Sequence, residues 1–317
     1  MIYIPHFLNL IVFGILLSTC NVFSPIGSPV ANEIRMDGDP LVRGAYIARS
    51  SNCISCHTSV PEGSPPLGGG RPIITKYGTF FSPNITPDPV NGIGQWNLED
   101  FRKALTKGIS PQGNHYYPVF PYTSFNAMSA ADLEDLWKYL ESIRPVKMVN
   151  RQHEIKFPFS SPLAPLFWKK AFFKPKPFQS NPEKSKHWNR GLYLVEVLGH
   201  CQECHSPRNF LGAVRNKAAY SGAKHPTDDG YIPNITPDPT SGIGDWDEED
   251  ISWFLQAGFL PNGDVASGIM AEIIEKGTSL LTKSDREAIA TFLKSLTPVR
   301  NPSLVRDPDT YDIEEDW

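Results

Sequence analysis

Two copies of a five-residue cysteine–histidine pattern are the residues of this 317-residue chain best suited to chemistry. Motif 1 is Cys53-Ile54-Ser55-Cys56-His57, and motif 2 is Cys201-Gln202-Glu203-Cys204-His205. The pattern C-x-x-C-H is typical of c-type haem attachment. Each cysteine sulfur forms a thioether with one porphyrin vinyl group, and the adjacent histidine supplies the proximal iron ligand. Two copies therefore predict two covalently bound haem c groups.

Other uses of paired cysteines explain the two motifs less well. The pairs could together form a Cys₄ zinc site, but zinc gives no reason for a histidine directly after each pair. A thioredoxin-like site would require a surrounding βαβ pattern, which the sequence lacks. A structural disulfide between residues three positions apart would be strained. We therefore interpret both motifs as haem attachment sites.

An electron-transfer haem also needs a second axial ligand, which is commonly a methionine sulfur. Met270 is the only methionine after His205, so we predict His205 and Met270 as the axial pair of the second haem. For the first haem we predict His57 with Met128, which comes just before an expected helix. Met148 follows that helix and is less well placed to reach across the haem. His115 remains the alternative ligand.

The haem propionates are anionic and require donors from the protein. Two arginines and two tryptophans in corresponding parts of the chain are predicted to donate to them: Arg71, Arg208, Trp96 and Trp246.

An internal repeat relates the two motifs. The sequence Asn-Ile-Thr-Pro-Asp-Pro occurs at residues 84–89 and again at 234–239, and each copy is followed by Gly-Ile-Gly-x-Trp. Arg-Gly-x-Tyr occurs at residues 43–46 and 190–193, shortly before the first cysteine of each motif. The long offset between copies indicates duplication of a whole domain rather than a short-period solenoid.

Each copy predicts the same short helices. The first covers residues 41–49 or 189–198 and leads into the motif. The second follows an N-cap at Asn97 or Asp247, and the third starts at Ser129 or Thr282 with an aspartate three residues on. Gly44 and Gly191 are expected to let the first helix cross the last one closely. The last helices are amphipathic, with apolar residues at i, i+3, i+4 and i+7: Leu133, Leu136, Trp137 and Leu140, or Ile289, Phe292, Leu293 and Leu296.

Charge and composition vary along the chain. Residues 146–190 hold ten Lys and Arg against two Glu, in a chain of net charge −4. This basic stretch has no clustered helical face, so we expect its charges to lie in solvent rather than to bind nucleic acid. Residues 150–182 are rich in proline and aromatic residues, which predicts a strap packed over both domains rather than a loose linker. Residues 301–317 form an acidic tail.

The N-terminal residues 1–31 are predicted to be a signal peptide or an N-terminal anchor. Residues 7–17 are apolar apart from Asn9 and Gly14, which is the length of a signal h-region, although no Lys or Arg precedes Arg35. Cleavage near Ala31, retention of residues 2–23 as an anchor and lipidation of Cys20 all remain open. Each predicts export, so we expect a periplasmic protein, either free or anchored to the inner membrane.

With these residues assembled, the chain resembles the cytochrome c subunits of membrane-associated periplasmic dehydrogenases for alcohols, gluconate and similar substrates. The resemblance covers residues 39–298 and rests on the two motifs, both NITPDP stretches, residues 117–125, 189–191 and 200–208. Two departures matter. Such subunits typically carry three haem motifs, whereas this chain has two. Many of them also read P-A-M-P-Y where this chain has Phe120, so a candidate methionine ligand is absent there and Met128 becomes the preferred one.

The resemblance implies a mainly α fold of two tandem class I cytochrome c-like domains with much loop. The domains would span residues 35–150 and 185–300, joined by the strap at 151–184. It also implies electron transfer from a periplasmic dehydrogenase to a quinone, an oxidase or another cytochrome, with no substrate chemistry in this chain. The alternative hypothesis is a dihaem cytochrome c peroxidase, which would need one iron with an open position.

The first prediction concerns the number of cofactors. The wild-type chain should carry two haems that stay attached after denaturation, as measured by the pyridine haemochrome assay. Replacing Cys53 and Cys56 by alanine should leave one haem, because only motif 2 then remains, and replacing Cys201 and Cys204 should do the same. A wild-type chain with one haem or none would contradict the assignment.

Overall fold

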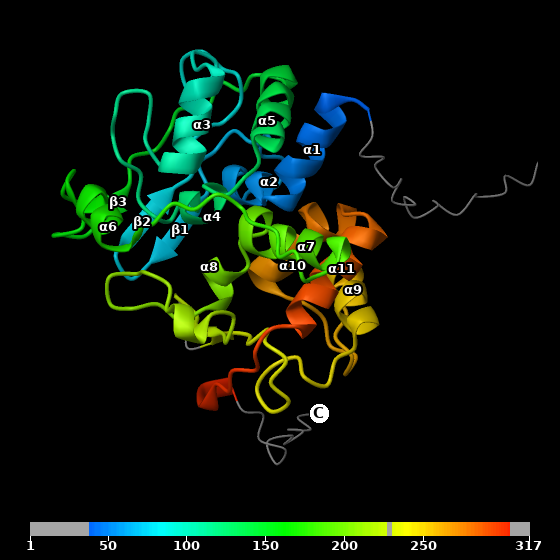
Figure 1. Ribbon diagram of the computed structural model, residues 1–317. Helices are drawn as coiled ribbons and strands as arrows, with labels where there is room; N and C mark the ends of the chain where they lie inside the picture. Colours follow the sequence, from blue (N-terminus) through cyan, green and yellow to red (C-terminus); the bar gives the residue numbers. More distant parts are fainter. Residues whose placement is uncertain (1–37, 227–229, 305–317) are drawn as a thin grey trace, which may run out of the picture. The chain divides into compact units, whose positions relative to one another are not determined.

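The computed structural model of this chain describes residues 38–226 and 230–304 (Figure 1). These residues are mainly helical, with eleven α-helices, and they belong to one compact unit. The predicted leader at 1–31 and the part of the acidic tail from 305 to 317 lie outside the described residues. Within the described ranges, no helix is both long and apolar enough to cross a membrane.

The first half of the chain, residues 38–150, contains five helices, one of which holds motif 1, and two paired strands. Their bounds are α1 Pro40–Ser50, α2 Cys53–His57, β1 Pro72–Thr75, β2 Gly78–Phe81, α3 Leu98–Lys107, α4 Tyr122–Phe125 and α5 Ala130–Ser142. The predicted N-caps are confirmed. Asn97 accepts from the Asp100 amide in a full capping box, and Ser129 accepts from the Asp132 amide.

The second half, residues 185–304, repeats this order. Its elements are α7 Lys186–Tyr193, a π-helical turn Leu194–Leu198, α8 Gln202–His205, a 3₁₀ turn Asn216–Ala218, β4 Ala223–Lys224, β5 Tyr231–Ile232, α9 Glu248–Ala257, α10 Gly268–Lys276, a 3₁₀ turn Thr278–Leu280, α11 Lys283–Lys294 and a 3₁₀ turn Pro302–Leu304. Asp247 and Thr282 are the N-caps of α9 and α11, as predicted. The 3₁₀ turn at 302–304 gives the start of the acidic tail a defined structure.

The helix before motif 2 differs from the prediction of a single helix over 189–198. It begins earlier, at Lys186, and its last turn is π-helical, with the Gly199 amide donating to the Leu194 carbonyl. The interval between arginine and first cysteine is ten residues from Arg43 to Cys53 but eleven from Arg190 to Cys201. A π-turn accommodates one extra residue without ending the helix. The inserted residue therefore explains the irregular turn.

Two glycines allow close helix crossings, as predicted. A Cβ atom on Gly44 would lie 2.1 Å from the Asp135 carbonyl oxygen in α5, and one on Gly191 would lie 1.9 Å from the Ala288 carbonyl oxygen in α11. No side chain fits at such distances. Both crossings bury the apolar faces of α5 and α11, and Figure 1 shows α1 beside α5 and α7 beside α11.

Residues 151–184 contact both halves. Strand β3, Glu154–Ile155, pairs with β2, and the Tyr117 hydroxyl donates to the Phe159 carbonyl. Helix α6, Ala164–Phe172, directs the Trp168 indole N–H to the Leu211 carbonyl of the second half. Lys169 contradicts the prediction that the charged side chains of this basic stretch lie in solvent. Lys169 is buried, and its ammonium donates to the carbonyls of Lys107 and Gly108 at the C-terminal end of α3.

One tyrosine hydroxyl group in each half forms hydrogen bonds with the other half. Tyr46 in α1 donates to Asp285 Oδ2 at 2.6 Å and accepts from the Thr282 amide at 3.1 Å, so it binds the N-terminus of α11 in the other half. Tyr193 in α7 donates to Asp132 Oδ2 at 2.5 Å and accepts from the Ser129 amide at 3.0 Å at the start of α5. Each tyrosine of the Arg-Gly-x-Tyr repeat thus completes a helix cap in the opposite half.

The second prediction tests these tyrosine hydrogen bonds. Tyr46→Phe should lower the free energy of unfolding by about 1–3 kcal/mol, because a buried carboxylate and a backbone amide lose one hydrogen-bond partner. Tyr193→Phe should have a similar effect. Guanidinium denaturation of the haem-loaded protein measures both, with Tyr231→Phe at an exposed tyrosine as the control. Equal midpoints for Tyr46→Phe and the control would show that the hydroxyl contributes nothing.

Candidate functional site

Each cysteine–histidine motif forms a short helix that starts from a left-handed residue. Asn52 has φ 55° and His200 has φ 39°, and each directly precedes the first cysteine of its motif. Asparagine and histidine are among the side chains that tolerate this conformation. The sharp change of direction ends α1 or the π-turn and begins a new helix, so that both cysteines and the histidine lie on one turn.

Both motif histidines are oriented by a proline carbonyl. His57 Nδ1 donates to the Pro83 carbonyl at 2.7 Å, and His205 Nδ1 donates to the Pro233 carbonyl at 2.8 Å. Because Nδ1 carries the proton, the lone pair of Nε2 is free to bind a metal. Burial lowers the pKa of both imidazoles, although the proline carbonyls oppose this shift. The neutral form required of an iron ligand is therefore favoured.

The NITPDP repeat holds these two carbonyls in place. Asn84, directly after Pro83, donates from Nδ2 to the Val146 carbonyl and accepts at Oδ1 from the Thr86 amide and hydroxyl. Asn234 makes the equivalent bonds to the Val299 carbonyl and to Thr236. Both asparagines are buried. The repeat thus anchors the residue that orients each histidine.

The cysteines of the two motifs lie close enough to influence one another. Desolvation raises the pKa of Cys53 to about 12 and that of Cys56 to about 11, and the negative charge of Cys204 contributes to the shift at Cys56. Cys201 has a pKa raised to about 12, also chiefly by burial. None of these four cysteines forms a disulfide, so their sulfurs are available for thioether bonds.

The methionines predicted as axial ligands do not occupy equivalent positions: Met128 directly precedes the N-cap of α5, whereas Met270 lies twelve residues before Thr282, the N-cap of α11. Met128 is 6% exposed and occupies the connection between α4 and α5. Met270 is half-buried near the start of α10 and packs against the apolar core. The sulfur of Met148 lies 3.6 Å from a Cβ built on Gly70, next to Gly69, whose amide donates to the His57 carbonyl. The preference for Met128 over Met148 stays a prediction.

His115, the alternative ligand, has a protein partner. Its Nδ1 lies 3.0 Å from Lys169 Nζ, and its pKa is lowered by burial and by the charge of that lysine. The contact ties His115 to the segment 151–184. It gives the side chain a structural use that is independent of iron.

The four predicted propionate donors differ in their contacts: the two arginines form ion pairs, and the two tryptophans pack against the core. Arg71 forms a two-point ion pair with Glu272 of α10, and Arg208 pairs with Glu203 of motif 2 at 2.6 Å. Trp96 and Trp246 pack against the core at the ends of the GIG-x-W turns. A propionate role for these four residues stays a prediction. Sequence reasoning missed Glu272 entirely, because its partner lies 201 positions away in the chain.

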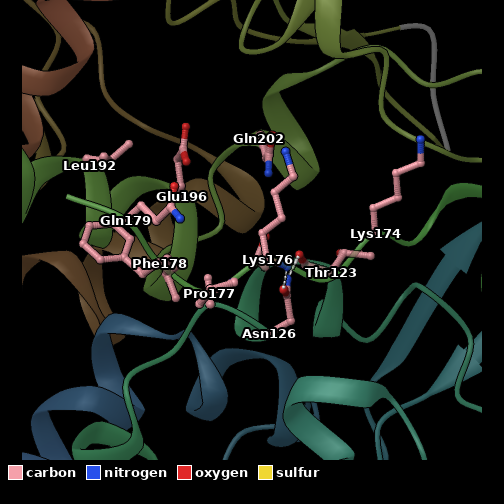
Figure 2. Close-up of a pocket in the computed structure, with 13 residues that line it drawn as sticks. Thr123, Asn126, Lys174, Lys176, Pro177, Phe178, Gln179, Leu192, Glu196 and Gln202 are labelled. Atoms are coloured by element: carbon pink, nitrogen blue, oxygen red, sulfur yellow. Dashed lines mark hydrogen bonds between the residues drawn. The ribbon is translucent and has the colours of Figure 1, made fainter. Parts of the chain in front are cut away.

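A separate pocket of about 320 Å³ lies next to motif 2 (Figure 2). Lys174, Lys176 and Phe178 line it from the connecting segment, and Glu196 and Gln202 from the second half. None of the motif cysteines or histidines lines this pocket, so it is distinct from the haem attachment groups.

The residues present fit a haem c at each motif. Two thiols and an imidazole with a free Nε2 lie on one helical turn, which is the donor set that thioether attachment and iron ligation require. Two buried tyrosine hydroxyls, Tyr122 and Tyr220, have no hydrogen-bond partner among the described residues. A buried hydroxyl without an acceptor is costly, and a haem propionate would supply one.

Comparison with known proteins agrees with this geometry. The profile of the family described as Cytochrome c matches residues 41–144. The chain is 40% identical over 262 residues to a dihaem cytochrome c-type protein of Cereibacter sphaeroides, covering 81% of this chain and 86% of that protein.

Two further relatives are larger than this chain. One is the cytochrome c subunit of alcohol dehydrogenase (quinone) from Gluconacetobacter polyoxogenes, 36% identical over 90% of this chain and 63% of the subunit. The other is a nicotinate dehydrogenase subunit of Pseudomonas putida, 38% identical over 81% of this chain. The matched region spans 21% of that second protein, so the chain corresponds to only a part of both.

The third prediction concerns the axial ligands. Met270→Ala should open the second iron, so that the reduced protein binds carbon monoxide and the potential of that haem falls, because the thioether favours iron(II). Met128→Ala should do the same to the first haem, and His115→Ala is the matched comparison. A Met128 variant with a normal spectrum, together with carbon monoxide binding by the His115 variant, would identify His115 as the ligand instead.

Proposed function

Because the chain belongs to the cytochrome c family, we propose that it is a dihaem electron-transfer protein that serves a dehydrogenase. In this proposal the chain consists of two tandem class I cytochrome c-like domains, residues 35–150 and 185–300. The strap at 151–184 joins them. The repeated helix order, the repeated caps and the contacts of residues 151–184 with both halves support this organisation.

The residues that would hold the cofactors follow from the two motifs. Cys53 and Cys56 would form the thioethers of one haem, with His57 and Met128 as axial ligands. The second haem would be held in the same way by Cys201, Cys204, His205 and Met270. Haem c iron, once bound, accepts and gives up one electron as it changes between iron(III) and iron(II).

One observation carries the functional proposal. At each motif the histidine is held by a backbone carbonyl, at 2.7 or 2.8 Å, and each half also contains a buried or half-buried methionine before its last helix. A pair of fixed side-chain ligands leaves no position for a substrate. It also limits rearrangement when the iron changes oxidation state, which suits electron transfer rather than catalysis.

The partners are proposed from the relatives. Since one relative is named as the cytochrome c subunit of an alcohol dehydrogenase, we propose that a dehydrogenase donates electrons to this chain. A quinone, an oxidase or another cytochrome would accept them. We further propose a periplasmic location, since haem c is attached outside the cytoplasm and residues 1–31 have the composition of an export signal.

The peroxidase alternative finds no support in the comparisons. A peroxidase would need one iron with an open or displaceable position. Two relatives are named as cytochromes, and none of the three is named as a peroxidase.

The fourth prediction distinguishes the two functions. The purified haem-loaded protein should be reduced by a dehydrogenase acting on its substrate, yet show negligible hydrogen peroxide turnover even when partly reduced. Outside residues 146–190 the sequence carries more acidic than basic side chains, which favours a partner with a basic patch, so reduction should slow as salt is added. Peroxide reduction at enzyme-like rates would overturn the proposal in favour of the peroxidase.

A further inference from the structure

An ion pair joins the two halves beside motif 1, where α10 packs against α2. Arg71 of the first half donates from Nη1 to Glu272 Oε1 at 2.8 Å, and its Nη2 lies 2.6 Å from Glu272 Oε2. The two side chains are only 15% and 19% exposed. Glu272 also accepts from Lys276 at 2.8 Å. Such a two-point geometry fixes both position and orientation.

On the first half, the pair is anchored to the loop that orients His57. The Arg71 amide donates to Ser82 Oγ, and the Ser82 amide donates to the Arg71 carbonyl. Ser82 directly precedes Pro83, whose carbonyl accepts from His57. Arg71 is therefore coupled through backbone contacts to the proximal ligand of the first haem.

On the second half, the pair is anchored to the helix that carries Met270. Glu272 lies two residues after Met270 in α10, and α10 packs against α2, the helix of motif 1. The segment that would supply the distal ligand of the second haem thus rests on the attachment site of the first.

We propose that the Arg71–Glu272 ion pair is a positioning element that couples the two haem sites, by fixing the helix of Met270 to the loop that orients His57. The inference rests on the proposed function, since Met270 must be an iron ligand for its position to matter. Removing Glu272 leaves the largely buried Arg71 without its counterion, and removing Arg71 leaves Glu272 paired only with Lys276 of its own helix; either change releases α10 from the loop of the first half. Ligation of the second iron then depends on an arginine of the first half.

The test uses the haem-loaded protein in its reduced state. A haem-bound methionine gives a ring-current-shifted methyl signal in proton NMR, and Met270→Ala identifies which signal belongs to the second haem. In Glu272→Gln and in Arg71→Met, that signal should broaden or lose intensity. Carbon monoxide should bind the second haem about tenfold faster, the change that ~1.4 kcal/mol produces in the population of the open form.

Three matched variants sharpen the result. The double variant Arg71→Met with Glu272→Gln should be no worse than either single change, because the pair acts as a unit. Arg71→Lys keeps the charge without the two-point geometry and should give an intermediate effect. The exposed pair Arg102–Glu134, at 3.5 Å within the first half, provides the control, and Arg102→Met should leave the Met270 signal unchanged.

Failure of the inference and failure of the proposed function give different results. If Met270→Ala removes a methyl signal but Arg71→Met and Glu272→Gln leave that signal and the carbon monoxide rate unchanged, the coupling is wrong and the ligation stands. A shift confined to the first haem in Arg71→Met, with Glu272→Gln silent, would instead assign Arg71 to a propionate and overturn the coupling. If Met270→Ala changes no signal, the proposed ligation itself fails.

Discussion

The hydrogen bonds of Tyr46 and Tyr193 connect the two halves more directly than the chain that joins them. Each hydroxyl bridges an aspartate and a backbone amide at the N-terminus of the last helix in the opposite half. A helix N-terminus that is removed from water needs acceptors for its amides, and here the other half provides one. The caps of α5 and α11 are therefore incomplete in an isolated half. This dependence makes two sequence repeats one structural unit.

Charges at the same interface add specificity to this arrangement. Burial alone would raise the pKa of Asp285, but the hydrogen bonds and charge of Arg190 outweigh it and the pKa is lowered. The stabilisation from this carboxylate is present above its unfolded pKa and is lost as the pH falls through the lowered folded value. Buried pairs contribute modest net stability, because desolvation offsets much of the attraction. Their larger effect is that a displaced helix would leave a buried charge unpaired, which disfavours alternative packings.

Much of each half could be predicted from the sequence, because the signals involved are local. The helix caps at Asn97, Ser129 and their counterparts depend on residues only three positions apart. The glycines at the helix crossings could be recognised because each follows the arginine of the Arg-Gly-x-Tyr repeat. The tyrosine of that repeat was noticed without its role, since a pattern within one half cannot reveal a partner in the other. Lys169 was assigned to solvent because its acceptors, two carbonyls at the end of α3, carry no sequence signal. The same limit applies to Glu272, while the π-turn could have been inferred from the one-residue difference between the repeats.

Like the two tyrosines, the segments that carry the candidate methionine ligands contact the opposite half. Helix α4, shortly before Met128, packs on the π-turn that leads into motif 2, and Thr123 donates to Glu203 within that motif at 2.7 Å. Helix α10, which carries Met270, packs on motif 1. The distal segment of each half is thus supported by the attachment helix of the other, and the proximal histidine is held by a loop of its own half. The interface that joins the halves therefore also supports both candidate ligand segments. For a relay, this arrangement keeps the separation of the two sites constant while each changes its charge.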